Sequence, residues 1–233
     1  MYETVDALLT GICDAIREKD GTTALISHQD IPSRIAGISS GSAITLGGFY
    51  TYDGGGLKVN DWVVSNFSER SCIYVEKAFK PLEKPWEIQV KFKTPVSYTH
   101  KYSTLLSANL TRSIQLNTEL QSDNTKLLFF GICTSNNAWT YRAYSDYMFE
   151  NNTWYYIRCI FDGIQYSVHV STDGLIFEKI ITIDYNGQFY QENDNNLLTF
   201  GGARSTTGNI CDCAIDLKET YIKIDGELWW GNG

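Results

Sequence analysis

The sequence has a shortage of positive charge and no long apolar run. Its 233 residues include 27 Asp and Glu against 19 Lys and Arg, which gives a formal net charge of −8. A chain this acidic is not expected to bind nucleic acid or an anionic membrane through general electrostatic attraction. No apolar stretch approaches the ~20 residues that span a bilayer. The first residues, MYETVDALLTGICDAIREKDG, carry acids and no basic leader, so no secretory signal is predicted and we expect synthesis in the cytoplasm.

The common metal and nucleophile motifs are also missing. The six cysteines form no Cys-x-x-Cys pair, and we interpret them as buried thiols rather than zinc ligands or disulfides. Only three histidines occur, and there is no Gly-x-Ser-x-Gly turn. Oxygen ligands for calcium are available at Asp184 and Asp194-Asn195-Asn196, but a polar loop is the favoured interpretation of these residues. We therefore expect no metal and no cofactor.

Acidic residues do not occur in the pattern that glycoside cleavage requires. Retaining cleavage uses two carboxylates ~5–5.5 Å apart, and acids two or four residues apart on one strand would share a face. Glu76 stands alone on its predicted strand, and Glu119 has only Asp123 nearby. Acids from separate strands could still meet, so a hydrolase stays an alternative, but the expectation is a protein that is not an enzyme.

What the sequence has in abundance is the alternation of β-strands. Tyr155–Phe161 and Ile164–Val170 alternate apolar and polar residues, and Asp162-Gly163 stands between them. A two-residue Asp-Gly loop forms a type I′ turn, which predicts a hairpin with Phe161 opposite Ile164. The same register places Tyr156 opposite His169 and Arg158 opposite Ser167 on the outer face.

Further strands are predicted along the chain. They lie at 86–94, with Ile88, Val90 and Phe92 facing inward, and at 127–132, 175–183, 195–201 and 221–230. The last of these is a second Asp-Gly hairpin, which would place Trp229 opposite Ile222 in the core. Trp230 would then lie opposite Tyr221, either exposed or against the helices at the N-terminus. Many strands separated by turns predict a mainly β, two-sheet antiparallel sandwich.

The N-terminal segment has a different, helical pattern. Val5, Leu8, Leu9, Ile12 and Ile16 recur at three- and four-residue spacing, which predicts a helix over 3–20, and a second short helix is expected over 27–36. Two such helices cannot bury a core alone. We predict a helical module at 1–38 for attachment or homo-oligomerisation, a linker at 39–42 and a sandwich over 43–233.

Both ends of the chain resemble a known family. The segment NNTWYYIRCIFDGIQYSVHVSTDGLIFE and the ending AIDLKETYIKIDGELWW are similar to the concanavalin A-like, or laminin G-like, jelly roll of bacteriophage tail proteins. The N-terminal LLTGICDAIREKDGTTALISHQDIPSRIAGI is similar to a short helical module at the start of tail and baseplate proteins of phages of Gram-positive hosts. The resemblance implies a concanavalin A-like jelly-roll β-sandwich behind a small α-helical N-terminal module, located in the virion tail. It supplies no fixed set of ligand residues.

These observations favour an adhesin that binds a host cell-surface glycan and contacts other virion proteins. Sugar binding needs flat aromatic rings beside hydrogen-bonding groups. Two stretches offer them, and the candidate residues are Trp139, Tyr141, Arg142, Tyr144, Tyr156, Arg158 and His169. The alternatives are a structural or decorating virion subunit without a ligand and, third, a glycoside hydrolase.

Overall fold

The computed structural model describes residues 10, 13–14, 49–52, 57–68, 71–75, 78–79, 84–108, 114–120, 126–134, 140–187, 189–190, 197–202 and 210–231. The chain divides into two compact units, Met1–Ile44 and Thr45–Gly233. The helices predicted over 3–20 and 27–36 and the linker at 39–42 lie outside the described residues, apart from Thr10, Cys13 and Asp14, which are helical. In the part of the chain that is described, no helix is long and apolar enough to cross a membrane.

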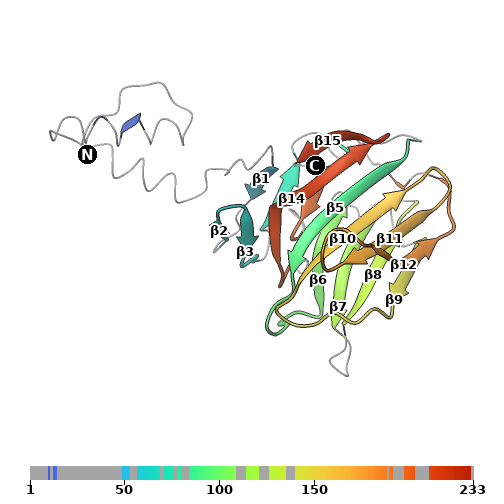
Figure 1. Cartoon of the computed structure of the whole chain (residues 1–233), viewed down its shortest axis with the longest axis horizontal. Coiled ribbons are helices and arrows are strands. Elements are labelled where there is room, and N and C mark those ends of the chain that lie inside the picture. The colour runs from blue at the N-terminus through green and yellow to red at the C-terminus, as the bar shows by residue number, and fades with distance from the viewer. Residues whose placement is uncertain are drawn as a thin grey trace. The chain divides into compact units, whose positions relative to one another are not determined.

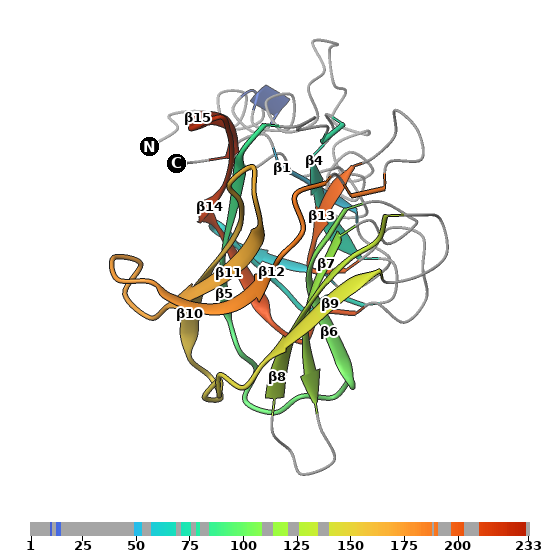
Figure 2. The same cartoon turned by 90° about the vertical axis from the view of Figure 1, so that its right-hand side faces the viewer.

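The second unit is a jelly-roll β-sandwich of two antiparallel sheets (Figures 1 and 2). The seven-stranded sheet contains, in spatial order, β1 (Phe49–Tyr52), β4 (Cys72–Val75), β13 (Leu198–Phe200), β6 (Tyr102–Ala108), β7 (Ile114–Leu120), β8 (Lys126–Ile132) and β9 (Tyr141–Ser145). The eight-stranded sheet contains β12 (Glu178–Ile183), β11 (Tyr166–Ser171), β10 (Trp154–Phe161), β5 (Trp86–Lys93), β14 (Ala214–Ile224), β3 (Val63–Ser65) and β2 (Lys58–Asn60). Its eighth strand, β15 (Glu227–Gly231), pairs with the end of β14.

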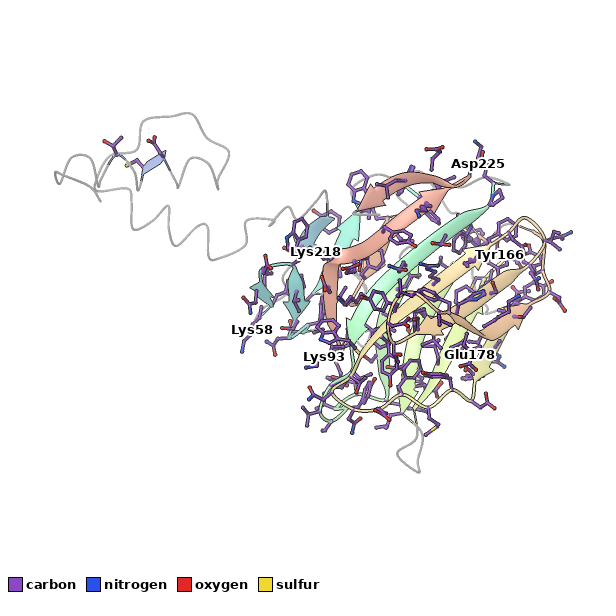
Figure 3. All side chains as sticks on the ribbon, viewed as in Figure 1. Lys58, Lys93, Tyr166, Glu178, Lys218 and Asp225 are labelled. Atoms are coloured by element: carbon purple, nitrogen blue, oxygen red, sulfur yellow. The ribbon has the colours of Figure 1, made fainter. Side chains whose placement is uncertain are left out.

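The core lies between the two sheets and follows the alternation read from the sequence. Ile88, Val90 and Phe92 of β5 are fully buried, as predicted. The uniformly apolar β8 contributes Leu128, Phe130 and Ile132 from the facing sheet. The outward positions of these strands are therefore the places where a ligand could bind. Lys93 and Asp225 mark opposite ends of the β5–β14 pair in Figure 3.

The hairpin of β10 and β11 forms, but its predicted register is wrong by two residues. Phe161 pairs with Tyr166 rather than Ile164, because the loop has four residues instead of two. The Asp162 carboxylate accepts hydrogen bonds from the backbone N–H groups of Ile164 and Gln165, at 2.8 and 2.9 Å. This side-chain cap makes the longer turn favourable. Ile164 is consequently 73% exposed, and Arg158 lies opposite His169 rather than Ser167.

The C-terminal hairpin has the predicted two-residue turn. Asp225 and Gly226 both take positive φ angles, 56° and 79°, as a type I′ turn requires. A bulge between Ile222 and Lys223 then shifts the pairing, so that Trp230 lies opposite Ile222. The predicted partners of Trp229 and Trp230 are therefore wrong by one residue, and both rings are partly buried against the core.

Candidate ligand-binding face

The outer surface of the seven-stranded sheet carries three rows of side chains in register. The first row runs Tyr74, Thr199, Ser107, Gln115, Gly131 and Arg142 across β4, β13, β6, β7, β8 and β9. The second row is Thr104, Asn117, Phe129 and Tyr144, and the third is Tyr102 and Glu119. We call these residues, together with Lys101 beside them, the polar face. Their strand neighbours Ile114, Leu116 and Leu128 belong to the core, so these side chains point away from it.

The centre of the polar face, on β7, is buried although it does not face the core. Gln115, Asn117 and Glu119, which alternate along β7, are only 5%, 6% and 9% exposed. Polar residues on an open sheet surface are normally well exposed to water. Burying a polar group destabilises the folded protein unless a hydrogen bond replaces the lost water. The hydrogen-bond partners of these side chains therefore need to be identified.

One atom in the middle of the face has no partner. The Oδ1 atom of Asn117 is buried and makes no hydrogen bond to the described residues. Its neighbour Gln115 is better placed, because its Nε2 group donates to Thr104 Oγ1 at 3.4 Å. An unpaired buried acceptor costs roughly 1–3 kcal/mol. An acceptor held in this way is suited to a hydroxyl or amide N–H group of a ligand.

Aromatic and charged groups lie next to this acceptor. The rings of Phe129 and Tyr144 approach to 5.3 Å between centroids, and Tyr144 remains 50% exposed. Lys101 Nζ lies 3.8 Å from Glu119 Oε1 and 5.0 Å from the centre of the Tyr102 ring. The face thus combines an exposed aromatic surface with amides and ions, which is the combination found in small-molecule sites.

The structure brings together two of the four residues predicted around β9. Arg142 and Tyr144 are exposed on the polar face. Tyr141 points to the other side, where its ring stacks on Tyr185 at 4.4 Å and packs against the core. Trp139 lies outside the described residues. β9 is an edge strand of its sheet.

Sequence reasoning missed the centre of the face. Gln115 and Asn117 occur in IQLNTEL, where apolar and polar residues alternate as on any half-exposed strand. The signal for a strand was therefore present. Nothing in the local pattern showed that the polar side would be buried, because that depends on strands far away in the sequence.

The other predicted stretch lies on the outer surface of the eight-stranded sheet, and Arg158 is occupied there. Its Nε group donates to Gln89 Oε1 at 2.8 Å, and its guanidinium lies 3.7 Å from the centre of the Phe177 ring. Glu87 accepts a hydrogen bond from the Tyr221 hydroxyl and lies 3.7 Å from Arg158 Nε. Burial and then this bond to Glu87 raise the pKa of Tyr221. Arg158 is thus engaged by Gln89, Glu87 and Phe177 of its own sheet and the adjoining turn.

The remaining candidates on this sheet also have internal partners. Tyr156 packs beneath the next turn, because a Cβ atom built on Gly174 would lie 3.0 Å from the Tyr156 ring. Lys91 Nζ pairs with Asp216 at 3.0 Å and lies 5.2 Å from the centre of the Tyr156 ring. His169 Nε2 lies 3.0 Å from Ser167 Oγ. Burial, then the nearby charges of Lys179 and Arg158, lower the pKa of His169. The candidate side chains on this surface bind one another within the sheet, so the polar face is the better candidate site.

Replacing Arg158 by alanine should therefore lower the free energy of unfolding by about 1–2 kcal/mol. The change leaves the nearly buried Gln89 amide without its donor and removes the stacking on Phe177. Urea unfolding measures the effect, and Lys179→Ala, an exposed change on the neighbouring β12, should stay within ~0.5 kcal/mol. Equal stability of the two variants would show that the Arg158 contacts contribute nothing.

Comparison with known proteins gives structural similarity only. No protein-family model and no curated protein matches the chain. Among solved structures, the enzymatically active domain of a tailspike protein from bacteriophage CBA120 matches with a TM-score of 0.50 at 11% identity, covering 69% of this chain and 25% of the tailspike chain. Domains LG4–5 of the mouse laminin alpha1 chain match with a TM-score of 0.47 at 10% identity, covering 76% and 45%. A heptameric pentraxin from Limulus polyphemus matches with a TM-score of 0.41 at 13% identity, covering 60% and 63%.

These matches bear on the fold and not on the function. The chain spans less than two thirds of the length of each of these three chains. At such low identity, the tailspike match supports a shared two-sheet architecture, consistent with the concanavalin A-like jelly roll predicted from the sequence.

Proposed function

We propose that this chain is a non-enzymatic, glycan-binding component of a bacteriophage or prophage tail. Its polar face holds a sugar of the host cell surface, and its N-terminal segment, predicted from the sequence to be helical, joins it to copies of itself or to other virion proteins. The observation that carries the binding proposal is the buried Asn117 Oδ1 atom, which has no hydrogen-bond partner among the described residues and lies in the same row as the exposed Tyr144, with Phe129 between them. A sugar supplies both a hydroxyl donor for the amide oxygen and an apolar ring face for the tyrosine.

Support for a place in the tail comes from the two ends of the chain. The hairpin with its Ser171-Thr172-Asp173-Gly174 turn and the AIDLKETYIKIDGELWW ending resemble phage tail proteins, as does the N-terminal segment. The tailspike match is compatible with this assignment but contributes only the fold. Neighbouring genes for tail assembly and lysis would support it, and a cluster of polysaccharide-degrading genes would count against it.

A structural virion subunit is the second candidate, and one turn favours it. The Asp173 carboxylate accepts hydrogen bonds from the N–H groups of Leu175 and Ile176, at 2.8 and 3.0 Å. This fixed turn leaves both aliphatic side chains at least 80% exposed. Exposed apolar residues on a fixed turn are suited to contact with another protein. The two candidates differ in whether the isolated chain binds host cell walls.

Purified cell walls of Gram-positive bacteria should bind the full chain, and Tyr144→Ala should weaken this binding about tenfold or more. Loss of a central aromatic contact typically costs above 1 kcal/mol, close to a factor of ten in affinity. Leu175→Ala, which removes a still more exposed apolar side chain from the turn between β11 and β12, is the control and should bind normally. Co-sedimentation measures both. If the unmodified chain fails to bind a broad panel of walls, the structural candidate replaces the adhesin.

Incubation with β-glucans, peptidoglycan or host polysaccharide should release no reducing ends. The three rows of the polar face carry one carboxylate, Glu119, which is paired with Lys101, whereas cleavage needs two carboxyl groups at a fixed separation. Glu76 and Asp123, the other acids considered, lie outside the described residues. Reproducible turnover that Glu119→Gln abolishes would refute the non-enzymatic assignment.

A further inference from the structure

Three groups of the polar face each require a different chemical partner in a ligand, and each requirement is here called a demand. The first comes from Asn117, whose Oδ1 atom is buried without a partner and needs a hydrogen-bond donor. The second comes from the ring of Tyr144, which stands beside Phe129 and offers an apolar surface. A neutral sugar satisfies both demands. The third demand comes from Arg142 and is not met by a neutral sugar.

Arg142 is an exposed cation whose position on β9 leaves it open to a ligand. Its partner on β8 is Gly131, which has no side chain, and the next position in the row is the Gln115 amide. No ion pair joins Arg142 to an acid within the described ranges. Lys91, Lys101 and Arg158 each lie within 4 Å of a carboxylate oxygen. The positive charge of Arg142 is therefore not neutralised by any described acid, although the chain has a net charge of −8.

The spacing of the three groups on the sheet indicates the size of the ligand. Arg142 and Tyr144 are two residues apart on one strand, so their Cα atoms are separated by ~6.8 Å on the same surface. Tyr144 lies opposite Phe129, which lies opposite Asn117. Neighbouring strands are ~4.8 Å apart, so Asn117 lies ~9.6 Å from Tyr144. A sugar ring stacked on Tyr144 would lie within reach of the guanidinium, and a second, linked sugar unit would extend over Phe129 to Asn117.

We infer that the bound glycan carries an acidic group, a carboxylate or a phosphate, which Arg142 holds while Asn117 accepts a hydrogen bond from a hydroxyl or amide group elsewhere on the same glycan. This inference rests on the proposed function and adds the substrate class. Arginine suits the role because its planar fork donates two parallel hydrogen bonds to such an anion. An acidic ligand would also supply the counter-charge that Arg142 lacks among the described residues.

The test uses the full chain and the cell walls that bind it. Arg142→Gln should lower binding about tenfold or more, and should reduce the sensitivity of binding to added salt. Lys179→Gln, which removes one exposed positive charge from the other sheet, should leave binding unchanged. Amidation of wall carboxylates and hydrofluoric acid removal of wall phosphodiesters distinguish the two sources of the anion. One of these treatments should reduce binding of the unmodified chain to the level of Arg142→Gln.

The outcomes separate this inference from the proposed function. Binding that survives both treatments, or that Arg142→Gln leaves intact while Tyr144→Ala destroys it, overturns the acidic ligand and keeps the glycan-binding function. Equal loss with Arg142→Gln and Lys179→Gln reduces the effect to net charge and also overturns it. Absence of binding by the unmodified chain removes the proposed function and this inference together.

Discussion

Asp212→Asn should lower the free energy of unfolding by about 3 kcal/mol, one of the largest effects available outside the apolar core. The Asp212 side chain is only 8% exposed. Its carboxylate accepts hydrogen bonds from the backbone N–H groups of Thr99 and His100, both at 2.9 Å. The Thr99 hydroxyl and His100 Nδ1 each lie 2.7 Å from the other oxygen. An asparagine has one acceptor oxygen and would turn an amino group toward these donors.

The position of Asp212 explains why this loss reaches the whole sandwich. Cys211 and Cys213 on either side of it are buried in the core, and its own N–H group donates to Ser103 Oγ at 2.8 Å. The carboxylate therefore fixes the 97–100 turn to the segment that leads into β14. Asp184→Asn, an exposed change of the same chemistry, is the matched control and should stay within ~0.5 kcal/mol.

The effect of Asp212→Asn should depend on pH in a defined direction. Burial alone would raise the pKa of Asp212, but hydrogen bonds from His100 and Thr99 outweigh burial, so the pKa lies below its ordinary value. A depressed carboxyl pKa contributes stability above the unfolded-state value of ~3.9, and this contribution is lost as the pH falls through the folded-state pKa. Urea unfolding at several pH values should show the stability gap between the two proteins narrowing below about pH 4. A gap that stays constant down to pH 3 would contradict an ionised, hydrogen-bonded Asp212.

The two Asp-Gly hairpins show what local sequence can and cannot determine. Strand identity follows from alternation, and the strands of the β10–β11 hairpin keep their predicted buried face, whereas the bulge in the C-terminal hairpin places Trp230 rather than Trp229 opposite Ile222. Register depends on the turn, and the same dipeptide forms two turns here. Asp225-Gly226 takes two positive φ angles, whereas Asp162 caps the N–H groups of a four-residue loop. A shift of two residues preserves the faces and changes every partner, so the contact of Arg158 with His169 could not be read from the pattern.

The polar face was beyond sequence reasoning for a related reason. Its rows run across strands that are far apart in the chain, such as β13 beside β6. Arg142 and Tyr144 were found because aromatic and basic residues are informative on their own. Gln115 and Asn117 are ordinary outward residues of a strand until their burial is known. Such a site is determined by which strands pair in the sheet. It is recognised in the structure by a buried atom that lacks a hydrogen bond, here Asn117 Oδ1.

Asn117→Leu should abolish glycan binding, with a loss of about a hundredfold or more, and leave the protein at least as stable as before. Leucine has the same branched side-chain skeleton and removes an acceptor that is buried without a partner among the described residues, so the cost of desolvating that oxygen disappears from the folded state. A gain of up to ~1 kcal/mol is expected, in keeping with the common exchange of stability for function at binding sites. Binding is lost because the hydroxyl or amide donor of the ligand would meet a methyl group.

Gln115→Leu provides the matched comparison for stability, because it replaces an amide by leucine on the same strand and face. Gln115 Nε2 has a partner in Thr104 Oγ1, so this variant should lose about 1 kcal/mol where Asn117→Leu loses none. Thermal or urea unfolding and cell-wall binding, measured on both variants, separate the two amides. A destabilised Asn117→Leu protein would mean that the oxygen is already satisfied in the free protein, for instance by ordered water. In that case the face would be a solvated surface, and the ligand would have to bind elsewhere on the sandwich.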